Sequence, residues 1–481
     1  MKISKVDITN FRLFKDQIKL NLNIPDTTNP GSGLTVLVGE NGCGKSTILD
    51  AVSYALLSYK SEGFSAEDIN DSQSDVEINI FSEEPFKVKG SMPNTNFYAK
   101  GFRFYGRIRS RSQSSYLSSM VTSDMFFIST DSTKPNPNSP DLRVSVNNPF
   151  SGPRFNENDV IYLDKNRTFQ TKTGTYNSTR FDRLMEDFAY QYVKSVNYEV
   201  PDVNEYLKGV SGRVQHSFLA SAINSFKEMT GVQIRVPLMD SWAPFKNAYF
   251  AERKENNLLI PLAKMGSGYE MLFSLVYSYE LSKQAKKQLI VLIDEPEIHM
   301  HPNMQKAFVD FILEASKEAQ IVMTTHSPLL IKQVMGCPNT KVLICKKDPT
   351  PSILNVEARV LPYVSANEVN YLAFQLPTSE FHNELYGYLQ TVASEEDINN
   401  EKERNFDNWL VGKGINQDKQ WIRISNGKLQ PSQNYTKQTF IRNTIHHPEN
   451  RNNETFDAML LEQSINEMIG IIKSLYPSET S

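Results

Sequence analysis

The residues best suited to chemistry lie near the N-terminus, in a glycine-rich loop between two apolar runs. The loop follows the apolar run 34–38 and consists of Gly39, Glu40, Asn41, Gly42, Cys43, Gly44, Lys45, Ser46 and Thr47. Glycines let successive backbone N–H groups converge on phosphate oxygens, and the N-terminus of the helix that follows adds positive potential. Lys45 can then reach the β and γ phosphates, and the Ser46 hydroxyl can ligate Mg²⁺. The order of strand, loop and helix therefore predicts a nucleotide site and disfavours a glycine turn that binds nothing.

A second motif supplies carboxylates. The apolar run 289–293 ends in Asp294, Glu295, Pro296 and Glu297, a pattern that predicts a buried parallel strand with acidic residues at its carboxyl end. Ligands of open α/β sheets bind at that edge. We expect Asp294 to hold the Mg²⁺ and Glu295 to orient or deprotonate the attacking water.

Another apolar run, 320–325, predicts a second buried strand and places His326 at its end. A histidine taken alone is more often a core or capping residue. Its position after a second strand of this kind favours a sensor of the γ-phosphate.

These motifs, with the segments 264–270 and 8–14, resemble the set found in ABC-type ATPases of the RecF, SMC and OLD branch. The resemblance implies an α/β P-loop head that binds ATP with Mg²⁺, hydrolyses it and closes as a homodimer around the nucleotide. It also implies that Arg12 contributes to nucleotide binding. Gly266, Ser267 and Gly268 would form the signature motif, at the N-terminus of a helix over 271–281, and contact the nucleotide of the second subunit. Gly266 stands where the family has a serine. No glutamine is assigned to the Q-loop, for which Gln73 is one candidate.

The composition fits an intracellular enzyme of several domains. The chain has 481 residues, of which 39% are hydrophobic, and its three cysteines are too few for a disulfide framework or a zinc site. The first residues contain no signal core, and no stretch reaches the roughly 20 apolar residues of a membrane span. We therefore expect a cytoplasmic protein without membrane contact. A net charge of -4 argues against a broadly basic nucleic-acid surface, although a local DNA or RNA groove stays open.

The pattern predicts an ATPase head over residues 1–350 and a mostly helical C-terminal unit over 351–481. Within the head we expect a β-rich lobe over about 1–165, a helical insertion over about 179–230, and a lobe over about 232–350 that carries the signature, carboxylate and histidine motifs. No sustained heptads separate the loop from the signature, which excludes a long coiled-coil arm. In the C-terminal unit we expect helices over 380–389, 439–447 and 459–475, and a polar loop over 402–428.

Two clusters have more than one interpretation. Arg103, Arg107, Arg109 and Arg111 alternate with aromatic residues, which fits a solvated strand face better than a nucleic-acid patch. His299 and His301 could suggest a metal pair. Because they follow the carboxylate strand where the ATPase branch has its D-loop, a segment at the dimer interface, we favour an interface role.

The C-terminal unit contains Arg442, Asn443 and His447, spaced as R-N-x-x-x-H. This resembles the motif of HEPN ribonucleases, in which the histidine would be the base and the arginine would stabilise the charged phosphorane. A helix end that is basic and stopped by Pro448 explains the same residues. An active ribonuclease, an inert HEPN-like bundle and an unrelated helical tail all remain open.

Three functions follow from these alternatives. The first is an ATP-driven molecular switch that controls an effector, and the second is a fused ATPase and ribonuclease toxin. The third is a slow ATPase scaffold that holds a separate nuclease subunit. Compact ATPases similar to the OLD branch commonly serve bacterial anti-phage defence, as in PARIS-type systems, so the resemblance implies a defence role. Glu380 and Glu384 lie in a predicted helix and not at strand ends, which argues against a fused TOPRIM nuclease.

Overall fold

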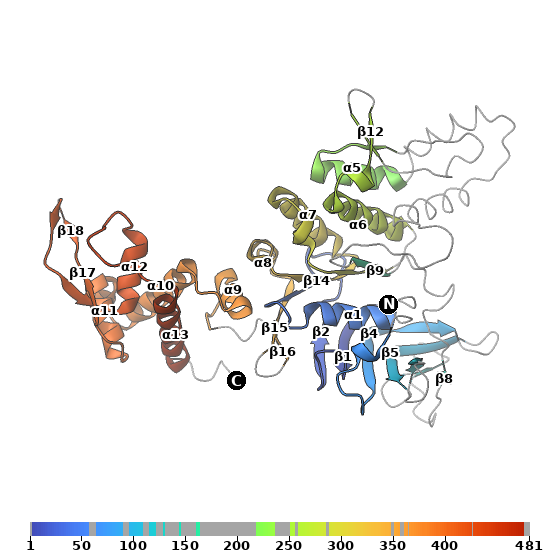
Figure 1. Ribbon diagram of the computed structural model, residues 1–481, viewed down its shortest axis with the longest axis horizontal. Coiled ribbons are helices and arrows are strands. Elements are labelled where there is room, and N and C mark those ends of the chain that lie inside the picture. Colours follow the sequence, from blue (N-terminus) through green and yellow to red (C-terminus); the bar gives the residue numbers. More distant parts are fainter. Residues whose placement is uncertain are drawn as a thin grey trace. The chain divides into compact units, whose positions relative to one another are not determined.

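The computed structural model describes residues 2–56, 64–89, 96–108, 115–121, 128–129, 144–145, 160–163, 218–235, 251–254, 258–284, 288–347, 351–355, 360–363, 365–425 and 427–475 (Figure 1). The chain forms two compact units, Met1–Ile353 and Leu354–Ser481. Most of the predicted helical insertion lies outside the described residues, as do Arg109 and Arg111.

The centre of the first unit is a six-stranded sheet in the order β16-β15-β3-β14-β13-β9. Its strands are β3 (Leu34–Val38), β9 (Val160–Leu163), β13 (Ile290–Ile293), β14 (Gln320–Thr325), β15 (Lys341–Lys346) and β16 (Ser352–Asn355). The pairs from β9 to β15 are all parallel. Every residue of β3, β13 and β14 is buried, as expected for apolar strands covered on both faces. The predicted α/β class is confirmed.

A second, antiparallel sheet uses the remaining N-terminal strands. These are β1 (Ile3–Thr9), β2 (Ile18–Asn21), β4 (Val76–Lys89), β5 (Asn96–Ile108), β6 (Ser115–Val121), β7 (Ile128–Ser129) and β8 (Val144–Ser145). The stretch 1–165 thus serves two sheets, because β3 and β9 belong to the parallel one. A small third sheet contains β10 (Ile234–Arg235), β11 (Ala251–Arg253) and β12 (Leu259–Pro261).

Helix α1 (Lys45–Leu56) begins inside the glycine loop and packs between the two large sheets. It contacts β1, β4 and β5 on one side and β13 and β14 on the other. Its apolar side chains, among them Ile48, Leu49 and Val52, join one hydrophobic cluster with residues of both sheets. The loop is therefore anchored by the core of the whole unit.

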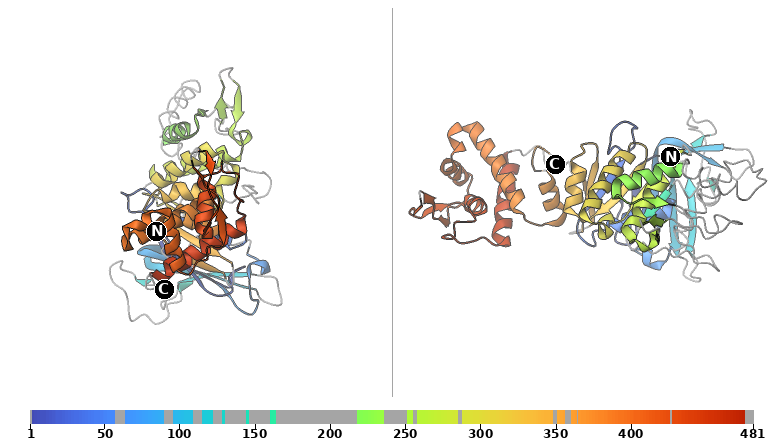
Figure 2. Two further views of the ribbon diagram at one scale, coloured as in Figure 1. Left: turned by 90° about the vertical axis from the view of Figure 1, so that its left-hand side faces the viewer. Right: turned by 90° about the horizontal axis from the view of Figure 1, so that it is seen from above.

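The opposite face of the parallel sheet is covered by helices. α6 (Ser267–Gln284), α7 (Pro302–Ala315) and α8 (Pro328–Met335) lie on this face, with α5 (Phe218–Thr230) packed on α6 (Figures 1 and 2). Phe226 of α5 meets Phe273 of α6 edge to face, with ring centroids 5.5 Å apart. The layers are thus helices, parallel sheet, α1 and antiparallel sheet.

The second unit packs five helices around its own core. They are α9 (Ala366–Phe374), α10 (Ser379–Glu396), α11 (Glu403–Gly412), α12 (Lys437–His446) and α13 (Ala458–Leu475). Two short antiparallel pairs accompany them: β17 (Lys419–Trp421) with β20 (Gln433–Tyr435), and β18 (Ile424–Ser425) with β19 (Lys428–Leu429).

The predicted loop over 402–428 is wrong, because α11 occupies its first part. Phe406 and Leu410, one helical turn apart, are fully buried. Asp407 is also buried, and its Oδ1 accepts hydrogen bonds from the backbone N–H and hydroxyl of Thr436. A polar residue thus occupies part of the inward face, which weakens the apolar periodicity by which a helix is recognised.

Two further predictions can be compared with the structure: the absence of a membrane span and the alternation of side chains along the strand that contains Arg103. No described helix is long and apolar enough to cross a membrane. Arg103 donates from Nε to Asn79 Oδ1 at 2.7 Å on the neighbouring strand, while Phe104 is buried, so these two residues follow the predicted alternation along the strand.

A buried histidine makes the second unit sensitive to acid. His382 on α10 is fully buried, with Nε2 3.0 Å from Ser464 Oγ on α13, and burial lowers its pKa to about 4. Below the ordinary pKa of 6.5 the unfolded chain binds a proton that the folded chain does not, so stability falls with pH between about 6.5 and 4, by up to about 3 kcal/mol. We expect the melting temperature of the second unit to drop in this window, and the drop to be smaller in His382→Gln. Calorimetry of both proteins at pH 7.5 and 5 tests this; equal drops would contradict it.

Candidate nucleotide-binding site

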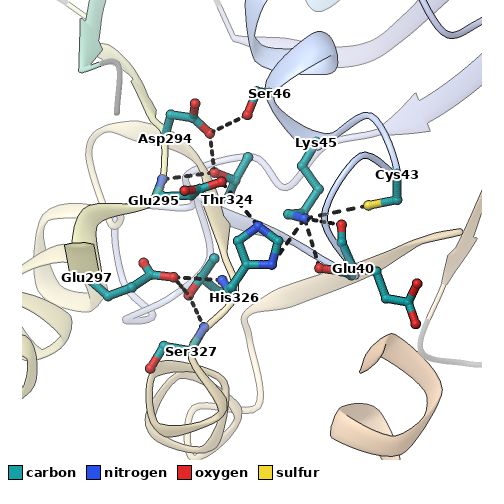
Figure 3. A network of polar contacts seen from close by, with 12 residues as sticks. Glu40, Cys43, Lys45, Ser46, Asp294, Glu295, Glu297, Thr324, His326 and Ser327 are labelled. Atoms are coloured by element: carbon teal, nitrogen blue, oxygen red, sulfur yellow. Dashed lines mark hydrogen bonds and ion pairs between the residues drawn. The ribbon is translucent and has the colours of Figure 1, made fainter. Parts of the chain in front are cut away.

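The predicted site residues meet at one edge of the parallel sheet. Because β3, β13 and β14 are parallel, their carboxyl ends lie together, with Met323 beside Ile293 and Thr325 beside Val38. This register brings the glycine loop, the carboxylates and the histidine into one polar network (Figure 3).

The loop conformation depends on its glycines. Gly39 and Gly44 have φ values of 147° and 99°, which side chains rarely adopt. A Cβ at Gly39 would lie 2.3 Å from the Cys345 carbonyl oxygen, and one at Gly44 would lie 2.4 Å from the Phe14 ring. The backbone can therefore follow this tight path only with glycine at both positions.

Lys45 is almost fully buried beneath this loop, at 4% exposure. Its Nζ donates to the carbonyl oxygens of Gly39 and Glu40, both at 2.8 Å, and lies 3.5 Å from His326 Nδ1. The ammonium group is thus held between the loop and the histidine, close to where the sequence predicts the phosphates.

Asp294 and Ser46 form a pair of oxygen ligands. Ser46 Oγ donates to Asp294 Oδ1 at 3.0 Å, and the same oxygen accepts from Thr324 Oγ1 at 2.6 Å. Carboxylate and hydroxyl oxygens suit Mg²⁺, which takes one or two protein ligands and completes its octahedron with phosphate and water oxygens. The residues present therefore fit the predicted metal.

Glu295 is held against His326 in a strained backbone conformation. Its φ of 45° and ψ of 62° place it in the left-handed region, an outlier typical of functional positions. Glu295 Oε1 lies 3.1 Å from His326 Nε2. With the Lys45 ammonium beside Nδ1, the consistent assignment is that Nδ1 accepts and Nε2 donates to the Glu295 carboxylate.

Thr324 and Glu297, which the sequence motifs did not single out, hold these groups in place. Thr324 Oγ1 accepts from the backbone N–H of Glu295 at 3.0 Å while it donates to Asp294, so one hydroxyl orients both carboxylate residues. Glu297 Oε1 accepts from Thr325 Oγ1 at 2.8 Å and from the His326 backbone N–H at 2.7 Å, which ties the two strand ends together. The sequence did contain a signal for Thr324. It is a polar residue at the end of an apolar strand, beside the strand that carries the acidic motif.

Arg12 connects α1 to the N-terminal strands through two carboxylates. Its guanidinium pairs with Asp68 at 2.8 Å and with Asp50 of α1. Burial opposes the charge, yet these carboxylates raise the pKa of Arg12 above its ordinary value. The contacts hold α1 to the N-terminal hairpin and the 3₁₀ turn Ala66–Asp68, and nucleotide binding by Arg12 stays a prediction.

The signature segment begins α6, which is longer at both ends than the predicted helix over 271–281. Gly266 has a φ of 115° and is exposed, with Ser267 and Gly268 as the first helical residues. Among the described residues, no hydrogen bond of the network in Figure 3 involves this segment. His301 caps α7, where its ring accepts from the Asn303 backbone N–H. Gln73 is exposed in the turn before β4.

The C-terminal motif residues point to different neighbours. Arg442 Nη1 donates to Asn443 Oδ1 at 2.9 Å and to Glu403 Oε2 at 3.3 Å, whereas His447 Nδ1 lies 3.3 Å from Glu449 Oε1. His446 lies between them: burial, then the nearby Arg442 and His447, lower its pKa.

The fold, with a glycine loop at the carboxyl edge of its parallel sheet, is that of an AAA domain. Residues 34–332, more than half of the chain, match the family described as "AAA domain, putative AbiEii toxin, Type IV TA system". The chain belongs to this family.

Similar proteins include the OLD nuclease of Thermus scotoductus, 24% identical over 347 residues that cover 68% of this chain and 59% of that protein. The endonuclease GajA of Bacillus cereus is 21% identical, with 70% and 57% covered, and the Septu protein PtuA of Bacillus mycoides is 21% identical, with 69% and 39% covered. The aligned part thus spans between 39% and 59% of these relatives. A solved Smc head bound to the C-winged helix domain of ScpA matches with a TM-score of 0.45 and 16% identity, covering 74% of this chain and 97% of that one. The predicted resemblance to the OLD branch is confirmed.

The Thr324 hydroxyl is expected to stabilise the site measurably. Thr324→Val keeps the shape of the side chain but leaves the buried Asp294 carboxylate with one hydrogen bond fewer, which should cost about 1–3 kcal/mol. Thr324→Ser retains the hydroxyl and serves as the matched control. Denaturant unfolding of the first unit should show a clear loss for the valine variant alone; equal stability of the two variants would contradict this role.

Proposed function

We propose that the chain is an ATP-binding and hydrolysing molecular switch of the OLD-like branch. The observation that carries this proposal is the chain of contacts from Lys45 through His326 to Glu295, beside the Ser46–Asp294 pair. Membership of an AAA family implies nucleotide binding, and this geometry gathers at one sheet edge the kinds of group that ATP hydrolysis requires.

Each residue would have a distinct task. The loop N–H groups and Lys45 bind the phosphates, and Ser46 and Asp294 hold Mg²⁺, which neutralises the charge that develops on the phosphate oxygens. Glu295 orients the water for in-line attack and accepts its proton. His326 donates to Glu295 from Nε2 and so fixes its carboxylate, while its ring is close enough to respond to the γ-phosphate.

The proposal extends to assembly and partners. Gly266 is exposed, and Ser267 and Gly268 are the first residues of α6, so this segment stands at a helix N-terminus, which would suit a contact with the γ-phosphate bound by a second copy. Closure of such a homodimer on ATP would be the switching event. The similarity to the OLD nuclease, GajA and PtuA supports a role in bacterial anti-phage defence, in which the switch controls an effector or a separate nuclease subunit.

Substitution of Glu295 and of Lys45 should separate hydrolysis from binding. Glu295→Gln should bind ATP, lose turnover by roughly 10²- to 10⁴-fold and accumulate as a dimer, because a water-orienting base is removed while the phosphate contacts remain. Lys45→Ala should lose nucleotide affinity and stay in its unliganded assembly. Phosphate release, ATP binding and mass by light scattering measure the three properties.

The matched control is Glu314→Gln, which neutralises an exposed carboxylate on α7. It should turn over ATP like the unaltered protein. Normal turnover in Glu295→Gln would refute the assignment of the base, and a Glu295→Gln protein that binds ATP without dimerising would refute the switch.

A second candidate function is RNA cleavage by the C-terminal unit. It is favoured by Arg442 and His446, which lie one helical turn apart near the end of α12, with His447 following as the C-cap. Burial, then the charges of Arg442 and His447, lower the pKa of His446. Such a cluster suits a phosphodiester. The bonds of Arg442 to Glu403 and Asn443 favour a structural role instead.

RNA products distinguish these roles. If the unit cleaves RNA, the protein with ATP and total cellular RNA should yield products that disappear in His447→Ala and in Arg442→Ala. If Arg442 only braces α11 to α12, Arg442→Ala should lower the melting temperature and no protein should yield products. Arg404→Ala, which removes a nearby exposed guanidinium, controls for lost charge.

A further inference from the structure

A β-hairpin formed by β18 and β19 stands at one end of the second unit (Figure 1). All described residues between 423 and 434 are exposed. Gly427 has a φ of 72°, which suits the tight turn between the strands. Because a two-stranded hairpin gains little stability from its own burial, an interaction explains this exposed ribbon better than packing does.

The strand register divides the side chains of the hairpin between two faces. Ile424 lies opposite Leu429, and such an apolar cross-strand pair stabilises the ribbon itself. Because successive side chains of a strand alternate, the residues on either side of this pair share the other face. That face is polar throughout and carries Arg423, Ser425, Lys428 and Gln430.

The base of the hairpin is fixed to the core of the unit. The backbone N–H of Ile422 donates to Asn453 Oδ1 at 2.6 Å, and its carbonyl oxygen accepts from Asn450 Nδ2 at 2.7 Å. Trp421, directly before it, is buried and meets Phe440 of α12 edge to face, with ring centroids 6.0 Å apart. The direction in which the ribbon projects is therefore set before any partner binds.

Positive charge gathers in this part of the unit. Residues 419–451 contain six lysines and arginines and one acidic residue, whereas residues 380–407 contain eight acidic residues and two basic ones. Arg423 and Lys428 belong to the basic stretch, and in the described part of the chain neither of them forms an ion pair. Charge complementarity therefore favours a polyanion as the partner of the hairpin.

The shape of the hairpin selects among polyanions. The three paired residues of each arm extend about 10 Å, and the major groove of B-DNA, about 12 Å wide and 8.5 Å deep, admits a two-stranded β-ribbon. The major groove of an RNA duplex is too narrow for side chains to read. Single strands are held by aromatic side chains that stack on bases, and residues 423–434 include no aromatic residue.

We propose that the hairpin over residues 423–430 binds duplex DNA by entering its major groove with the polar face toward the bases. Arg423 and Lys428 contact phosphates, while Ser425 and Gln430 lie where they can hydrogen-bond base edges. The inference goes beyond the proposed ATP-driven switch, because it rests on residues of the second unit alone.

The test measures binding of the full chain to a fluorescein-labelled DNA duplex by fluorescence anisotropy. The double variant Arg423→Gln, Lys428→Gln should bind at least about tenfold more weakly at low salt, because two phosphate contacts are lost. Between about 50 and 200 mM NaCl, the slope of log K against log salt should also become shallower by about 1.8, or about 0.9 for each contact. The single strand and an RNA duplex of the same sequence should bind more weakly than the DNA duplex.

The matched control is the double variant Lys19→Gln, Lys473→Gln, which removes two exposed positive charges outside the hairpin. It should bind the DNA duplex like the unaltered protein, and both double variants should keep the melting temperature. No binding of the DNA duplex, an equal loss in the control, an unchanged hairpin variant, or equally tight binding of the single strand or the RNA duplex would each overturn the proposal. ATP turnover measured without DNA decides the proposed function separately.

Discussion

The parallel register of β3, β13 and β14 is the constraint on which the site depends. Because Met323 lies beside Ile293 and Thr325 beside Val38, three chain segments distant in sequence end at the same edge. A shift of one residue would turn Thr324 and the residues after it to the other face. The fully apolar interiors of these strands make such a shift costly, since the buried residues on both faces would lose their neighbours.

Helix α1 connects the edge of the parallel sheet to the rest of the first unit. Asp50, on its second turn, accepts from the Tyr162 hydroxyl of β9 at 2.8 Å and pairs with Arg12 of the N-terminal hairpin. The helix that starts at Lys45 is thus tied to the parallel sheet and the hairpin by the same carboxylate. Because of these contacts, a movement of the glycine loop would shift residues in both sheets. The proposed nucleotide-driven switch requires such coupling.

Much of the fold and site could be predicted because buried strands appear in the sequence as continuous apolar runs. The bounds of β3 and β14 match the predicted strands, and Lys45, Asp294, Glu295 and His326 each follow an apolar run that predicted a buried strand. What could not be predicted rests on side chains that face one another across elements. Thr324 and Glu297 act through contacts that depend on register. α11 was missed because Asp407, a buried polar residue that accepts from Thr436, interrupts its apolar face.

The C-terminal motif illustrates the same limit. Sequence spacing suggested that Arg442 and His447 act together, but five residues along a helix correspond to about 500° of rotation, so such side chains point apart. His447 moreover lies just after α12 as its C-cap, with φ of −127° and ψ of 57°. It is His446, one turn after Arg442, that shares its face. A spacing motif alone therefore identifies a candidate, and the helix geometry decides which partner it has.

The polar groups of the proposed nucleotide site form hydrogen bonds with one another. Lys45 donates to two loop carbonyls, Ser46 to Asp294, and His326 lies against Glu295. A buried ammonium without such partners would be strongly destabilising. Each of these contacts is one that a phosphate oxygen, Mg²⁺ or the attacking water could replace. Binding would therefore exchange partners inside a preformed network, and the energetic balance between internal and ligand contacts would set the affinity.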